Sequence, residues 1–67
     1  MIQIRLNGET QSIPEETNLS QLLAQLRVNP RQVAVAKNLE VILRAELENT
    51  RMSEGDEIEI FQAVGGG

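Results

Sequence analysis

The 67-residue sequence contains no cysteine and no histidine, and this absence excludes several kinds of site. A disulfide framework, a cysteine or histidine metal centre, a thiol nucleophile and a histidine general base all need side chains that the chain lacks. Phe61 is the single aromatic residue, so there is no platform on which nucleic-acid bases could stack. No apolar run approaches the roughly 20 residues that a membrane-spanning helix needs.

The charge balance is acidic, with ten acidic residues against six basic ones and a net charge of −4. Six of the acids lie between positions 46 and 59, where Arg51 is the one base. This acidic flank argues against nucleic acid and favours a basic partner surface, although a merely solvated face is the alternative. No signal peptide is evident after Met1, and the length allows one domain over residues 1–67. We therefore expect a cytoplasmic protein that is monomeric when free.

A β-hairpin is predicted at the start of the chain. Apolar and polar side chains alternate over residues 1–6, which is typical of a half-buried strand. Asn7-Gly8 follows, and both residues tolerate the positive φ of a type I′ turn. Residues 9–13 predict the return strand, which Pro14 ends because proline has no backbone donor.

A helix is predicted over residues 18–27. Asn18 suits the N-cap, and Gln21 can complete a capping box. Asn29-Pro30 marks the end of the helix. Four leucines recur at the spacing of one helical face, and we expect them in the core rather than in a groove for a partner: Leu19, Leu22, Leu23 and Leu26.

Three more strands and a helical turn are predicted in the second half of the chain. In the last strand, Ile58 and Ile60 share one face, and Phe61 lies on the other with Glu57 and Glu59. In chain order we predict a strand at 32–36, a turn at 37–40 with Asn38 at positive φ, a strand at 41–43, a helical turn at 45–49, a turn at 53–56 and a strand at 57–63.

This order predicts an α+β domain in which one main helix covers one face of a mixed sheet of four to five strands. The first and last strands are expected side by side and parallel in the centre, joined by a right-handed crossover. That arrangement is the β-grasp, or ubiquitin-like, fold. Residues 64–67 are expected to form a flexible tail, because glycine is the least restrained residue.

The residues offer no self-contained catalysis, so we expect that the chain is not an enzyme. The serines have no histidine to activate them. The carboxylates at 56, 57 and 59 lie on or beside an exposed strand face, with no room expected for a pocket. What remains is the terminal carboxylate of Gly67, which an acyl-adenylate would activate. The alternative to a reactive carboxylate is a frayed terminus without a function.

Phe61 is expected to form a small apolar patch with Ala63 and Val64 beside the tail. Exposed apolar patches tend to mark interfaces, so these three residues are candidates for partner docking. The alternative is that Phe61 fills a secondary core under residues 44–52.

The sequence resembles the ThiS family, the sulfur carriers of thiamine biosynthesis, over its whole length. The resemblance is strongest in Val33-Ala-Val-Ala-Lys-Asn38, in Arg44 and in the segment from Glu54 to the Ala-Val-Gly-Gly-Gly ending. Two departures are Leu39, where glycine often follows asparagine, and Leu43, where proline is common.

The resemblance implies a mechanism in which partners act on the tail. An ATP-dependent, ThiF-like activating enzyme adenylates the Gly67 carboxylate, and a cysteine desulfurase system supplies the sulfur that makes a thiocarboxylate. A ThiG-like thiazole synthase then accepts the sulfur. Gly65 and Gly66 would thread into these partners. The chain itself binds no cofactor, and ATP is used by the activating partner.

Three other functions remain open at this point. The small subunit of molybdopterin synthase shares the fold and the Gly-Gly ending, although it is usually longer with a bulkier approach to the tail. A ubiquitin-like modifier would join Gly67 to a target lysine. A plain interaction module would have an inert tail.

Overall fold

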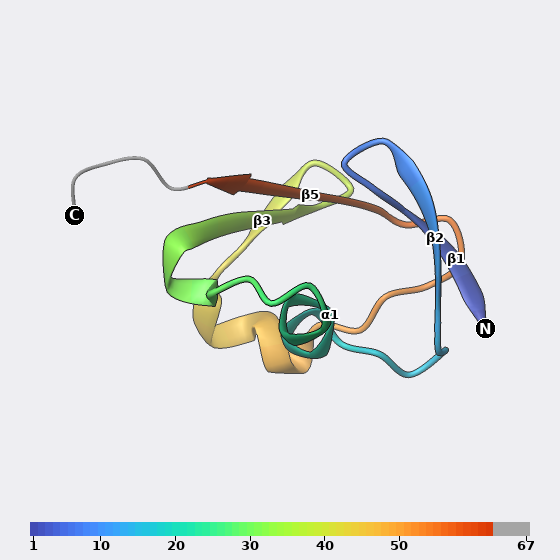
Figure 1. The fold of residues 1–67 in the computed structure, drawn as a ribbon, viewed down its shortest axis with the longest axis horizontal. Helices are drawn as coiled ribbons and strands as arrows, with labels where there is room; N and C mark the ends of the chain where they lie inside the picture. The colour runs from blue at the N-terminus through green and yellow to red at the C-terminus, as the bar shows by residue number, and fades with distance from the viewer. Residues whose placement is uncertain (63–67) are drawn as a thin grey trace.

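The computed structural model describes residues 1–62, in which a five-stranded sheet packs against one α-helix (Figure 1). The predicted tail at 64–67, and Ala63 before it, lie outside the described residues. The elements in chain order are β1 (Ile2–Leu6), β2 (Glu9–Ile13), α1 (Leu19–Gln25), the 3-10 turn η1 (Pro30–Gln32), β3 (Val33–Lys37), β4 (Glu40–Ile42), the 3-10 helix η2 (Arg44–Asn49) and β5 (Glu57–Gln62).

The sheet has the order β2-β1-β5-β3-β4, so the last strand lies in the middle. β1 pairs with β5 in parallel, with Arg5 opposite Glu57. β3 pairs with β5 in antiparallel orientation from Val33 opposite Gln62 to Lys37 opposite Ile58. This confirms the predicted mixed sheet of the β-grasp fold, with the first and last strands adjacent and parallel.

The first hairpin forms where the sequence predicts it. Asn7 and Gly8 have φ angles of 50° and 86°, which fit the two central residues of a type I′ turn. Its register places Leu6 opposite Glu9 and Ile2 opposite Ile13. β1 therefore presents Ile2, Ile4 and Leu6 to one face of the sheet, and β2 adds Ile13 to the same face.

Helix α1 begins as predicted and ends earlier than predicted. The Asn18 side chain accepts from the Gln21 amide at 2.7 Å, and Gln21 Oε1 accepts from the Asn18 amide at 3.0 Å, which completes the capping box. The predicted end at Asn29-Pro30 is wrong, because the helix stops at Gln25. Leu26 is 41% exposed and is not the core residue that was predicted.

The reason for the early end is a Schellman motif. Arg27 has φ 58°, its amide donates to the Ala24 carbonyl, and the Val28 amide donates to the Leu23 carbonyl. Val28, and not Leu26, packs against the core. Glycine is the usual residue at the left-handed position, so an arginine there gave no sequence signal.

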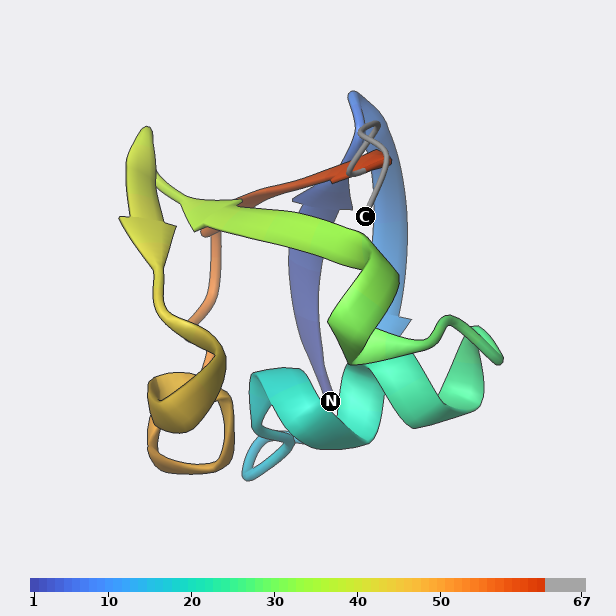
Figure 2. The same cartoon turned by 90° about the vertical axis from the view of Figure 1, so that its left-hand side faces the viewer.

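The core lies between α1 and one face of the sheet, which we call the inner face. Figure 2 shows α1 and η2 on the same side of the strands. Burying a large apolar side chain contributes roughly 1.5–3 kcal/mol. The most deeply buried side chains come from both layers: Ile4, Leu19, Leu23 and Ile58. The fold thereby anchors β5 in the centre while its opposite, outer face carries no helix from residues 1–62.

Candidate functional site: the central strand and its outer face

The predicted site residues fall into two groups. Gly65, Gly66 and Gly67, with Ala63 and Val64, lie outside the described residues, and their predicted roles stay predictions. Phe61 lies in β5, whose end at Gln62 is the last residue that the structure describes. The strand that leads to the predicted site can therefore be described in detail.

Asn38 fixes the start of β5. Its amide donates to the Glu57 carbonyl at 2.7 Å, and its Oδ1 accepts from the Glu57 amide at 2.9 Å. Its Nδ2 donates to Asp56 Oδ1 at 3.1 Å. Asn38 reaches this position because it adopts φ 52°, as the sequence predicted, in the turn between β3 and β4. The β3–β4 turn and the start of β5 are thus joined by three hydrogen bonds.

Asp56 is the buried polar residue of this junction. Its Oδ2 accepts from the Ser53 amide at 2.7 Å and lies 3.7 Å from Lys37 Nζ, which itself donates to the Arg51 carbonyl at 3.0 Å. The Asp56 side chain is 12% exposed. Because both carboxylate oxygens are hydrogen-bonded, this carboxylate is a structural group and not a free catalytic one.

Asn7 holds the middle of β5 from the other side. Its amide donates to the Ile58 carbonyl, and its Oδ1 accepts from the Ile60 amide, both at 2.9 Å. β1 has ended at Leu6, so the Asn7 side chain replaces the next backbone acceptor of the ladder. The register of β5 is therefore fixed from both neighbours.

The outer face carries an apolar row that crosses three strands near the end of β5. Phe61 is 51% exposed and lies opposite Ala34 of β3. Ile42 of β4 lies opposite Val35, so Leu43, the next residue, lies beside Ala34; Leu43 is 69% exposed. Phe61 is thus an exposed residue of the outer face and not the filling of a secondary core under 44–52.

A second row lies next to it. Val41 of β4, 66% exposed, is opposite Ala36, and Ala36 is opposite Glu59 of β5. Ile42 packs against the core, so Val41 and Leu43 on either side of it point outward. We call Ala34, Val41, Leu43 and Phe61 together the outer patch.

Sequence reasoning missed the contribution of β4 to this patch. Val41, Ile42 and Leu43 are three apolar residues in a row, and such a run does not reveal which members face outward. The pairing of β4 with β3 shows that Val41 and Leu43 face outward.

The acids predicted for the exposed face of the last strand lie there. Glu57 is exposed, and Glu59 is half-buried. Both glutamates lie on the same face of β5 as Phe61. Glu59 precedes Phe61 by two residues, so the glutamates border the outer patch toward the start of β5. The outer face therefore has an apolar end near Gln62 and a charged end near Glu57, where Arg5 of β1 lies opposite Glu57.

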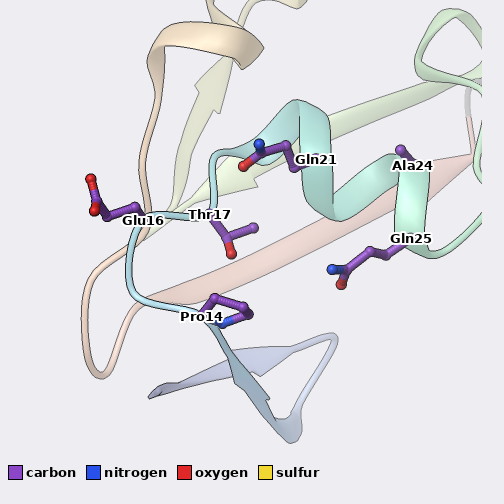
Figure 3. Close-up of a pocket in the computed structure, with 6 residues that line it drawn as sticks. All are labelled: Pro14, Glu16, Thr17, Gln21, Ala24 and Gln25. Carbon is purple, nitrogen blue, oxygen red and sulfur yellow. The ribbon is translucent and has the colours of Figure 1, made fainter.

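A hollow lies between the end of β2 and α1, where the sequence analysis expected no room for a pocket. Figure 3 shows Thr17 and Gln25 facing this space and the Glu16 carboxylate pointing away from it. Glu16 is its one ionisable lining residue and lies 3.7 Å from Arg51 in an exposed ion pair. The hollow therefore offers no acid–base pair. Its lining residues are Pro14, Glu16, Thr17, Gln21, Ala24 and Gln25.

Residues 1–62 lack two kinds of feature. No group of three or more acidic side chains there is placed to hold a metal ion. None of the helices in that part of the chain is long and apolar enough to cross a membrane.

A solved structure has the same fold as this chain. The crystal structure of the thiamine biosynthesis protein (ThiS) from Geobacter metallireducens matches with a TM-score of 0.87 and 30% identity, over 98% of this chain and 100% of that one. The sheet order, the single main helix and the central last strand define a β-grasp domain. The model of the ThiS family matches residues 4–67, and the chain belongs to this family.

Two curated relatives are thiazole synthases. The protein from Paramagnetospirillum magneticum is 34% identical over 62 residues, which are 92% of this chain and 19% of that protein. The protein from Magnetococcus marinus is 36% identical over 66 residues, which are 98% of this chain and 20% of that protein. The chain thus spans about a fifth of the length of these relatives. Each of them contains a segment similar to this domain within a longer chain.

Proposed function

We propose that this chain is the sulfur carrier for the thiazole moiety of thiamine. Its Gly67 carboxylate is adenylated by a ThiF-like enzyme that uses ATP, with release of diphosphate. A desulfurase passes the sulfur of cysteine to a partner thiol as a persulfide, and the outer sulfur of this persulfide displaces AMP from Gly67. A second thiol then reduces the resulting S–S bond, which leaves a Gly67 thiocarboxylate and a disulfide on the thiols. A ThiG-like thiazole synthase accepts that sulfur.

The observation that carries this proposal is the match of the ThiS family through residue 67, which includes all three final glycines. The thiazole synthase relatives support it, since they contain a similar segment in the same chain as the synthase. The central position of β5 also supports it, because a strand held on both sides gives residues 63–67 a fixed starting point.

The catalytic steps belong to the partners in this proposal, and the chain itself is a substrate. Phe61, Ala63 and Val64 contact the partner, while Gly65 and Gly66 enter its channel, because residues without a Cβ fit where larger side chains would not. The half-exposed Phe61 on the outer face is consistent with this docking role.

Intact-mass measurement tests the proposal. The chain is incubated with ATP, the activating enzyme, a cysteine desulfurase, cysteine and a thiol reductant. We expect a mass gain equal to the exchange of one oxygen for one sulfur, and a variant that lacks Gly67 should show no gain while its melting temperature stays the same. An unchanged mass of the intact chain contradicts the carrier function, and a covalent adduct with another protein would indicate a modifier.

Complementation separates the two sulfur-carrier pathways. We expect the gene to restore growth of a strain that requires thiazole and not to restore molybdopterin synthesis in a strain that lacks the small subunit of molybdopterin synthase. The Gly67 deletion serves as the matched control in both strains. The reverse pattern would assign the chain to molybdopterin synthesis.

A further inference from the structure

We propose that the free edge of β2, together with the hollow beside Thr17, binds an extended peptide segment of another protein. The segment adds a strand to the sheet, places one side chain in the hollow and carries basic residues at its two ends. This site is independent of the proposed sulfur transfer, because β2 lies at the end of the sheet and β1 separates it from β5.

The backbone groups of β2 alternate between its partner β1 and the free edge. The first turn has two residues, so the residues that flank it, Leu6 and Glu9, form a hydrogen-bonded pair. Every second residue of β2 from Glu9 onward therefore points its amide and carbonyl toward β1. The residues between them, Thr10 and Ser12, point theirs toward the free edge, where no strand of residues 1–62 pairs with them.

β2 lacks the features that usually protect an edge strand. Its pairing with β1 runs without a bulge from Glu9 opposite Leu6 to Ile13 opposite Ile2. The strand contains no proline, lysine or arginine, and its one charged residue is Glu9 at the start. A regular edge without these features is a template for pairing with another chain. The other edge strand, β4, has only three residues, so β2 is the edge of this sheet that suits a strand from a partner.

The hollow lies at the end of this edge, between α1 and the end of β2 (Figure 3). Its volume is about 450 Å³, which is within the range of ligand pockets. Cross-strand neighbours share a face of a sheet, so a peptide residue opposite Ile13 points to the inner face, as Ile13 does. The edge therefore supplies backbone pairing, and the hollow receives a side chain of the same peptide.

Thr17 is a buried residue whose hydroxyl is open only to the hollow. It is 5% exposed, its amide donates to the Pro14 carbonyl at 3.2 Å, and its carbonyl accepts from the Met52 amide at 3.3 Å. The Thr17 side chain faces the hollow, and its hydroxyl has no partner among residues 1–62. No fully enclosed side-chain oxygen in that part of the chain lacks a partner, so this hydroxyl is reached through the hollow. A rigidly held hydroxyl is thus available to a ligand group.

The lining of the hollow selects a neutral side chain that both donates and accepts hydrogen bonds. The Thr17 hydroxyl and the Gln25 carboxamide can each donate and accept, and both face the space. Pro14 and Ala24 add apolar contact, and the Glu16 carboxylate points away. A charged side chain in the hollow would lack a counter-ion, which is costly. The peptide residue that enters the hollow is therefore an asparagine, glutamine, serine or threonine.

The charges around the edge define the two ends of the peptide. Residues 6–26 contain three glutamates and no base: Glu9 at the start of β2, and Glu15 and Glu16 after its end. Glu15 lies 4.0 Å from the Met1 amine and Glu16 lies 3.7 Å from Arg51, but these pairs are exposed and weak and leave the carboxylates accessible. A peptide with a neutral centre and a base at each end complements this pattern.

The test is an NMR titration of the isotope-labelled full chain with a short synthetic peptide. In this peptide valine and threonine alternate around a central glutamine, with an arginine pair at each end. The control peptide has a glutamate pair at each end instead. On the protein side, Ser12→Pro removes the amide at the free edge without removing a hydrogen bond between β1 and β2, and the matched variant Ser12→Val keeps that amide.

We expect the arginine-flanked peptide to shift the signals of Thr10, Ser12 and Thr17 and to slow hydrogen exchange of the Thr10 and Ser12 amides, because these amides gain acceptors. Ser12→Pro should lower the affinity at least about ten-fold, and Ser12→Val should stay within about two-fold of wild type. Thr17→Val keeps the side-chain shape and should lower the affinity about five-fold, the effect of one hydrogen bond. The glutamate-flanked peptide should bind at least about ten-fold more weakly.

Four results overturn the inference. One is the absence of any change at Thr10 and Ser12 with the arginine-flanked peptide in millimolar excess. Another is equal affinity for the two peptides, and a third is signal changes confined to the outer patch, which would place the peptide there. The fourth is a wild-type dimer in sedimentation equilibrium that Ser12→Pro abolishes, since a second copy would then occupy the edge.

Two further points keep the test decisive. If Ser12→Pro does not fold, Ala24→Phe replaces it, because it fills the hollow from an exposed position of α1, and unchanged affinity of that variant contradicts the site. The titration uses neither ATP nor the activating enzyme, so its result does not depend on whether the chain carries sulfur.

Discussion

The side-chain oxygen of Asn7 accepts a hydrogen bond of 2.9 Å from the backbone amide of Ile60, so a residue of the first turn holds the last strand. β1 ends one residue before Asn7, and without this bond the Ile60 amide would lack its acceptor from β1. The contact continues the β1–β5 ladder by one hydrogen bond toward Gln62. It links the opening hairpin to the strand on which the proposed sulfur transfer depends.

Replacing Asn7 with glycine should weaken this link. Glycine adopts φ 50° without strain, so the loss of the hydrogen bond dominates, and we expect about 1 kcal/mol less stability in urea unfolding. The Ile60 amide should exchange its hydrogen faster by NMR. Asn7→Asp keeps an acceptor and should preserve the protection of that amide. Equal protection in the glycine variant would contradict the contact.

Replacing Asp56 with alanine should destabilise the domain strongly. The change removes the acceptor of the Ser53 amide and of Asn38 Nδ2 at a nearly buried position, so we expect a loss of about 2–3 kcal/mol in the free energy of unfolding. The matched control is Glu16→Ala, which removes the exposed ion pair with Arg51 and should change stability by less than about 0.5 kcal/mol. Similar effects at both positions would contradict the structural role of Asp56.

Replacing Arg27 with glycine should stabilise the domain. Arg27 is the left-handed residue of the Schellman motif at φ 58°, where glycine carries no steric penalty, so we expect a gain of about 1 kcal/mol or less in chemical denaturation. Arg27→Val should destabilise instead, because a β-branched side chain is the least compatible with this conformation. The reverse order of the two variants would contradict the assigned end of α1.

Replacing Leu39 with glycine should also stabilise the free domain, by up to about 1 kcal/mol, because φ 71° suits glycine and the leucine side chain is exposed. Leu39→Asn should lie between the two, since asparagine tolerates this region. Thermal unfolding of the three proteins gives the order. A fall in melting temperature for the glycine variant would show that Leu39 makes stabilising contacts within the domain.

Replacing Phe61 with serine separates docking from packing. Phe61 is half exposed on the outer face, so the melting temperature should fall by only a few degrees, the effect of about 1 kcal/mol in a domain of this size. Affinity for the activating enzyme and for thiazole synthase should fall by at least about ten-fold. Leu19→Ala, at a fully buried position, is the contrasting control, with an expected loss of about 2–5 kcal/mol. A large loss of stability with unchanged binding would assign Phe61 to the core.

The sequence predicted those parts of the fold that depend on local chemistry. Asn7-Gly8 specified the first turn, and Asn18 with Gln21 specified the start of α1, because each depends on residues within one turn. Asn38 at positive φ was predicted for the same reason. The parallel pairing of the first and last strands in the centre of the sheet followed from the need to cover one face of the sheet with one helix.

The parts that were missed depend on contacts between distant residues. The end of α1 is fixed by Arg27, which adopts a left-handed conformation that arginine does not favour. No pattern in the sequence therefore showed that Val28, and not Leu26, packs against the core. The outward direction of Val41 and Leu43 depends on the pairing of β4 with β3. The hollow beside Thr17 forms where the end of β2 meets α1, which no single segment encodes.

The central position of β5 also has a mechanical consequence. A force applied along the strand at Gln62 acts on the ladder with β1 and the ladder with β3 at the same time, and in each the hydrogen bonds run across the strand direction. Such bonds are loaded in shear and must break together, whereas a peeled hairpin opens one bond at a time. We therefore expect that a pulling force applied to β5 at Gln62 must be large before the domain unfolds.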